Sequence, residues 1–137
     1  MASASDFAAW AQKDLMIPFG GQTYRVCPPD VDRAGVLLAC AIRAEVNLGL
    51  VAGPIPEGVQ EVLDSITDEH PALTEEVYQQ MVANKVPKVS IDRFAYYATF
   101  FWARGEEYAD MLARLMFTPR VTDDLFPDED GGDSPKV

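Results

Sequence analysis

Aromatic side chains are concentrated in one short segment late in the chain. Six of the fourteen Phe, Trp and Tyr residues lie within nine positions. They are Phe94, Tyr96, Tyr97, Phe100, Phe101 and Trp102. Ser90 is a good N-cap and predicts a helix from Ile91 to about Ala103. On this helix Phe94, Tyr97 and Phe101 share one face, and the whole apolar arc spans about 240°, more than contact with one neighbouring element requires.

Two interpretations account for so wide an arc. Either the helix lies at the centre of the fold and is buried on several sides, or one face packs inward while another, rich in Tyr and Trp, contacts a partner. Aromatic residues dominate interface energetics, and Tyr and Trp tolerate partial exposure. We therefore predict that the six aromatic residues bind a partner. We expect truncation of Tyr96 or Trp102 to weaken binding more than folding.

The remaining sequence is typical of a small, mainly helical domain. Helix caps and apolar periodicity predict further helices over residues 6–12, 32–48, 59–66, 74–84 and 106–117. The second of these is apolar on almost all sides, which favours a buried, central position. We expect one helical domain over residues 1–120, followed by a disordered acidic tail over residues 121–137, which is rich in charge, Gly and Pro.

A β-hairpin is predicted near the N-terminus, over residues 15–26. Two apolar-rich runs flank Gly20-Gly21, a pair that suits a tight turn with positive φ. Pro18 has no N–H to donate to a sheet, so the first run is expected to be an edge strand.

Charge is distributed unevenly along the chain. There are 11 Lys and Arg residues against 22 Asp and Glu residues, a net charge of -11. Residues 44–84 contain eight carboxylates and no Lys or Arg, whereas residues 85–120 are mildly basic. This balance argues against nucleic-acid binding, which requires a basic surface, and against binding to an anionic membrane. A contact between these oppositely charged segments in two copies would produce a homo-oligomer.

The sequence offers little that points to catalysis or metal binding. His70 is the one histidine, and Cys27 and Cys40 form no C-x-x-C pair. There is no zinc-ligand spacing, dinucleotide-binding Gly motif or P-loop. We expect a non-catalytic protein without cofactor or metal; an enzyme that uses Cys40 or His70 is the hypothesis with the least support. Neither a signal peptide nor a membrane-spanning stretch is evident, so a cytoplasmic location is expected.

The predicted hairpin resembles a segment of a known family. Residues 15–26 have the sequence LMIPFGGQTYRV and are followed by Pro28-Pro29-Asp30. This segment resembles the N-terminus of tail assembly chaperones from long-tailed actinobacterial phages, in which an apolar-Pro-x-Gly-Gly-Lys-x-Tyr-x-Val run precedes a Pro- and Asp-containing break and a mostly helical body. Gln22 stands where Lys is common in that family. No family motif aligns with the aromatic segment, so no functional residue is carried over to it.

The resemblance implies a non-catalytic function in the cytoplasm of a bacterial host. Chaperones of this family bind the long, helical tape measure protein, keep it soluble and help recruit tail tube subunits. The chain would be the short form, made without a ribosomal frameshift. A different hypothesis rests on the carboxylates of residues 44–84: a small acidic helical inhibitor, or DNA mimic, that binds a basic partner.

Overall fold

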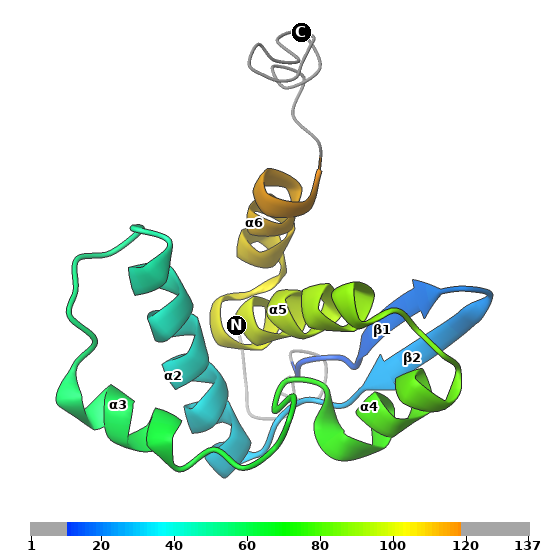
Figure 1. The fold of residues 1–137 in the computed structure, drawn as a ribbon, viewed down its shortest axis with the longest axis horizontal. Coiled ribbons are helices and arrows are strands. Elements are labelled where there is room, and N and C mark those ends of the chain that lie inside the picture. The colour runs from blue at the N-terminus through cyan, green and yellow to red at the C-terminus, as the bar shows by residue number, and fades with distance from the viewer. Residues whose placement is uncertain (1–10, 119–137) are drawn as a thin grey trace, which may run out of the picture.

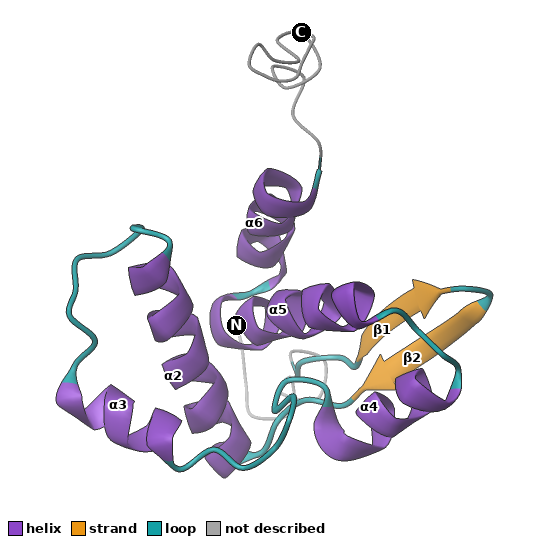
Figure 2. Ribbon diagram, in the orientation of Figure 1, coloured by secondary structure: helices purple, strands orange, loops and turns teal. Residues whose placement is uncertain are grey.

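The computed structural model describes residues 11–118 of the chain. Its elements are β1 (Leu15–Phe19), β2 (Gln22–Val26), α2 (Val31–Asn47), α3 (Glu57–Asp64), α4 (Thr74–Ala83), α5 (Lys88–Arg104) and α6 (Glu106–Phe117). This part of the chain is mainly helical with an N-terminal hairpin, as predicted (Figure 2). Most of the helix predicted over residues 6–12 lies outside the described residues, and residues 11 and 12 are not helical. The predicted tail, residues 121–137, lies wholly outside them.

The hairpin forms as its sequence predicts. β1 and β2 pair antiparallel with Leu15 opposite Val26 and Ile17 opposite Tyr24. Both residues of Gly20-Gly21 have positive φ, which gives a turn whose twist matches that of the strands. Alternate residues of a strand point to one face, so these four side chains are buried together against the helices.

Helix α5 occupies the centre of the described fold. In Figure 1 the hairpin and α4 lie on one side of it, α2 and α3 lie on the other, and α6 projects away from the body. Ile91, Ala98 and Trp102 of α5 pack in a core cluster with the hairpin and α4. Phe100 packs in a second cluster with Ala41 of α2 and with α6. Because α5 contributes to both clusters, it holds the two sides of the fold together.

The prediction that residues 32–48 form the buried central helix is wrong. One side of α2 is buried through Leu37, Ala41 and Glu45, but Leu38 is 41% exposed and Val31 is 89% exposed. α2 packs against α3 and α5 and also contacts α6, while the side that carries Val31 and Leu38 faces solvent. Its apolar composition was a poor guide to its position because small Ala and Val side chains do not require burial on every side.

The start of α5 differs from the predicted one, whereas its end is set by a glycine. The helix begins at Lys88 after Pro87, and not at Ile91 after Ser90 as predicted. Pro87 has φ -58°, close to the helical value, and its missing N–H needs no partner at a helix start. At the other end Gly105 has φ 104° and ψ 164°, a conformation nearly restricted to glycine. This residue ends α5 and begins α6, so it sets the sharp turn between them.

A buried ion pair joins α2, α5 and α6. Glu45 of α2 is only 4% exposed. Its carboxylate accepts hydrogen bonds from Nε and Nη2 of Arg104, at 3.0 and 2.8 Å, and from the hydroxyl of Tyr108 at 2.9 Å. The hydrogen bonds from Arg104 hold the pKa of Glu45 below its ordinary value, although burial opposes them. Bidentate bonds between Arg and a carboxylate fix geometry as well as adding energy, so this pair positions the α5–α6 junction on α2.

Replacing Glu45 by Ala should lower the free energy of unfolding by about 2–4 kcal/mol, because Arg104 and Tyr108 lose their acceptor. The Arg104 side chain is 35% exposed, which places the effect below that of a fully buried pair. The folded-state pKa of Glu45 is lowered, so its contribution is present above the unfolded pKa of about 4.3 and is lost as the pH falls through the folded-state pKa.

Urea unfolding near neutral pH and at a pH of about 3 measures both effects, since the unfolded carboxyl titrates between these values. Glu61→Ala, which removes an exposed carboxylate from α3, is the matched control and should change stability by less than about 0.5 kcal/mol. Equal losses in the two variants, or a loss in Glu45→Ala that does not shrink in acid, would contradict the role given to this ion pair.

Candidate partner-binding groove

The six aromatic residues of α5 are distributed around the helix and do not form one surface. Phe100 is 1% exposed and Trp102 is 9% exposed, and they belong to different core clusters. The other four, Phe94, Tyr96, Tyr97 and Phe101, are half-buried. The wide aromatic arc therefore arises largely because α5 is covered on two sides. The expectation that truncating Trp102 affects binding more than folding is corrected: its ring lies in the core of this chain.

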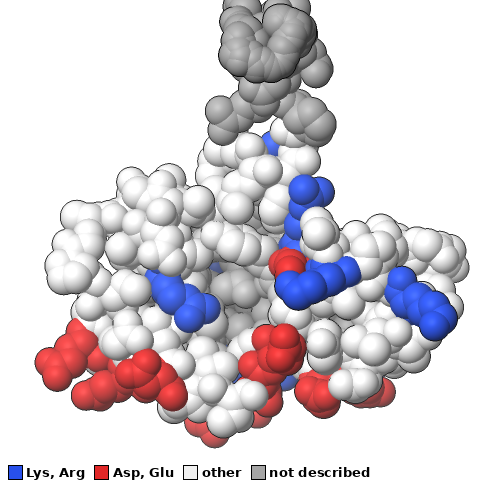
Figure 3. Space-filling view, in the orientation of Figure 1, with Lys and Arg blue, Asp and Glu red and all other residues white. Residues whose placement is uncertain are grey.

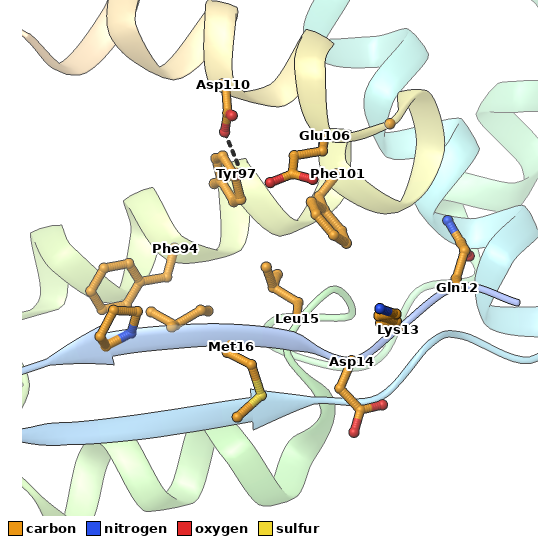
Figure 4. Close-up of a pocket in the computed structure, with 13 residues that line it drawn as sticks. Gln12, Lys13, Asp14, Leu15, Met16, Phe94, Tyr97, Phe101, Glu106 and Asp110 are labelled. Carbon is orange, nitrogen blue, oxygen red and sulfur yellow. Dashed lines mark hydrogen bonds between the residues drawn. The ribbon is translucent and has the colours of Figure 1, made fainter. Parts of the chain in front are cut away.

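Phe94, Tyr97 and Phe101, which the helical periodicity placed on one face, line an open groove of about 800 Å³. Residues 12–18, which lead into and include most of β1, form the opposite wall. Gly105, Glu106 and Asp110 close one end where α6 begins. In Figure 4 the ring of Phe101 points from α5 toward β1, whereas the hydroxyl of Tyr97 points to Asp110 of α6; Leu15 extends from the strand into the space below these rings.

Phe94, Tyr97 and Phe101 form the floor of the groove, and contacts with the core hold this aromatic floor in place. Phe94 meets Phe19 of β1 edge to face, with 5.2 Å between ring centroids. Phe101 meets the buried ring of Trp102 in the same way at 4.8 Å. Edge-to-face contacts restrict the orientation of both rings. The groove therefore presents a preformed apolar surface, which reduces the entropy lost on binding.

The rim of the groove is mainly acidic. The hydroxyl of Tyr97 donates a hydrogen bond to Asp110 at 2.5 Å. Burial, followed by this hydrogen bond, raises the pKa of Tyr97 far above its ordinary value, so the ring stays neutral. Glu106 and Asp14 also lie at the rim, and Asp14 pairs with Arg25 at 3.1 Å. An apolar floor beneath a carboxylate-rich rim suits apolar side chains flanked by Lys or Arg.

A second, smaller pocket gathers the residues considered for catalysis. It measures about 290 Å³, lies between α2 and α5, and is lined by Cys40 and His70 among others. Nε2 of His70 is 3.7 Å from a carboxylate oxygen of Asp92. Burial raises the pKa of the Cys40 thiol, which leaves it protonated and weakly nucleophilic near neutral pH. This arrangement gives no support to a catalytic cysteine.

Residues 11–118 meet the requirements of neither a metal site nor a membrane-spanning helix. That part of the chain contains no group of three or more His, Cys, Asp or Glu side chains able to hold a metal ion. None of its helices is long and apolar enough to cross a membrane.

The carboxylates of residues 44–84 form an exposed acidic edge, with one exception. Glu45 is buried in its ion pair, whereas the other seven are exposed. These seven, which define the acidic edge, are Glu57, Glu61, Asp64, Asp68, Glu69, Glu75 and Glu76. Figure 3 shows acidic side chains along the lower border of the molecule, with Lys and Arg above them. No member of the acidic edge lines the groove, so the two surfaces are separate.

The fold and the groove define a small helical domain with an N-terminal hairpin and an open groove lined by aromatic side chains. The chain belongs to the family described as Domain of unknown function (DUF7426), whose model matches residues 5–124. Comparisons with curated proteins and with solved structures give no match. Because the family match includes every described element, both the groove and the acidic edge lie within the family domain.

Trp102→Ala is expected to lower the free energy of unfolding by about 3–5 kcal/mol, the usual cost of deleting a large buried aromatic side chain. Phe94→Ala should lower the free energy of unfolding by clearly less, because the Phe94 ring is only half-buried on the floor of the groove. Denaturant unfolding of the two variants compares them directly. A smaller loss for Trp102→Ala than for Phe94→Ala would show that Trp102 is not part of the core.

Proposed function

We propose that this protein is a non-catalytic tail assembly chaperone, which binds the tape measure protein of a phage and keeps it soluble during tail assembly. The observation that carries the proposal is the open groove with its aromatic floor. The hairpin segment that resembles such chaperones supplies one wall of this groove through residues 15–18. The resemblance and the binding surface therefore involve the same part of the chain.

The groove is suited to one face of an amphipathic client helix. Helix-in-groove recognition uses apolar anchors spaced three or four residues apart, and Phe94, Tyr97 and Phe101 have this spacing on the receiving side. The acidic rim favours client segments in which Lys or Arg flanks the apolar anchors. A tape measure protein is long and helical, so it offers many such segments. Single weak contacts would gain strength if the chaperone self-associates along its client.

The acidic edge has a supporting role in this proposal. Its carboxylates lie outside the groove, so they remain in water when a client is bound. A high negative charge on the exposed surface of the complex opposes aggregation. The same edge could contact Arg93 and Arg114, which lie exposed on α5 and α6 of a second copy. We place this function in the cytoplasm of the bacterial host. Tail tube subunits are proposed as further partners.

Co-expression with the tape measure protein tests the proposal. The wild-type chain should raise the soluble fraction of the tape measure protein and co-purify with it. Replacing Phe94 and Tyr97 together by Ala should remove most of both effects, because the floor of the groove is lost. Leu115→Ala is the matched control, because it truncates an apolar side chain that is 56% exposed on α6 outside the groove.

Circular dichroism and denaturant unfolding must show that the Phe94 and Tyr97 variant is folded. The proposal fails if wild-type protein and tape measure protein never associate, or if the folded groove variant binds as well as Leu115→Ala does.

The small acidic inhibitor, or DNA mimic, stays the alternative. It would use the acidic edge and not the groove. Binding to a basic partner through exposed carboxylates weakens steeply with salt, whereas apolar contacts in a groove do not. The two hypotheses therefore differ in both the surface involved and the response to salt.

A further inference from the structure

The groove begins where the N-terminal segment enters the described fold. Gln12, Lys13 and Asp14 line it before the chain continues into β1. Trp10 precedes Gln12 by only two positions. Two residues span at most about 7 Å, so Trp10 is within about 7 Å, along the chain, of a residue that lines the groove.

The residues before Gln12 have the composition of a groove ligand. Residues 5–10 read SDFAAW and contain one charged side chain, Asp6. Phe7 precedes Trp10 by three positions, a separation of about 4.5 Å in a helix and about 10 Å in an extended chain. Both aromatic side chains can therefore reach the groove without any change in residues 11–118. Their spacing also matches that of Phe94 and Tyr97 on the floor.

The extent of the family domain gives independent support. The family match begins at residue 5, ahead of the first described residue, so residues 5–10 belong to the domain itself. In the sequence they are separated only by residue 11 from Gln12, which lines the groove.

We propose that residues 5–10 occupy the groove in the free protein, with Phe7 and Trp10 against the rings of Phe94, Tyr97 and Phe101. In this arrangement the chain protects its own aromatic floor from water. The inference also bears on the proposed function, because a client helix would have to displace this segment before binding. Client binding and self-occupation are then competing states of one surface.

Nuclear Overhauser effects in the isotope-labelled full-length protein, without any client, test the proposal. We expect contacts from the indole protons of Trp10 to the ring protons of Phe94 and Phe101. In a mixture of labelled and unlabelled protein, filtered spectra should lack these contacts, since they arise within one chain. Absence of the contacts, or their appearance between chains, would overturn the proposal.

A full-length variant with Phe7 and Trp10 replaced by Ala supplies a second measurement. Its open groove should increase the fluorescence of the neutral apolar dye Nile red several-fold over wild type. Replacing Ser3 and Ser5 by Ala, just before and at the start of this segment, is the matched control and should leave the signal unchanged. An unchanged signal in the Phe7 and Trp10 variant would overturn the proposal.

The two proposals fail separately. If Trp10 contacts the groove but the tape measure protein never binds, the proposed function is wrong and self-occupation stands. If Trp10 makes no such contact while client binding still depends on Phe94 and Tyr97, self-occupation alone is wrong.

Discussion

The bidentate ion pair between Glu45 and Arg104 determines how the helices around the groove are arranged. The buried carboxylate of Glu45 is tolerated only when it has its partner, so the end of α5 has one favoured position on α2. Tyr108 joins the same carboxylate and thereby brings in the first turns of α6. Since Glu106 and Asp110 of α6 close one end of the groove, its shape depends on a contact made outside it. The turn at Gly105 makes this arrangement possible.

Local signals in the sequence predict the hairpin and the approximate positions of helices α2 to α6, but neither the start of α5 nor the arrangement of the helices. The hairpin followed from Gly20-Gly21 between two apolar runs, and the shared face of Phe94, Tyr97 and Phe101 followed from helical geometry. Which helix is central could not be inferred, because neighbours on each side are set by contacts distant in sequence. Glu45 shows the same limit: the sequence places it among the eight carboxylates of residues 44–84, yet it is buried, and its partner Arg104 is 59 residues away. Trp102 and Phe100 likewise entered the core through contacts that periodicity does not reveal.

Aromatic residues on α5 therefore have two separate roles. Phe100 and Trp102 stabilise the fold from opposite sides of the helix, whereas Phe94, Tyr97 and Phe101 remain accessible at the groove. Because Phe101 packs edge to face on Trp102, the aromatic lining of the groove is an extension of the core. The acidic edge lies elsewhere on the molecule, and the charged residues of the groove lie at its rim. An open apolar groove on a strongly acidic domain suits the proposed chaperone of an aggregation-prone helical client.

The central claim is that the groove, and not the acidic edge, is the surface that meets the partner. Titration of isotope-labelled full-length protein with a helical segment of the tape measure protein, followed by amide chemical shifts, tests it most directly. The account predicts shift changes concentrated at residues 12–18 and 94–110, which persist as salt is raised. Changes confined to the acidic edge over residues 57–76, abolished by salt, would contradict it and favour an acidic inhibitor.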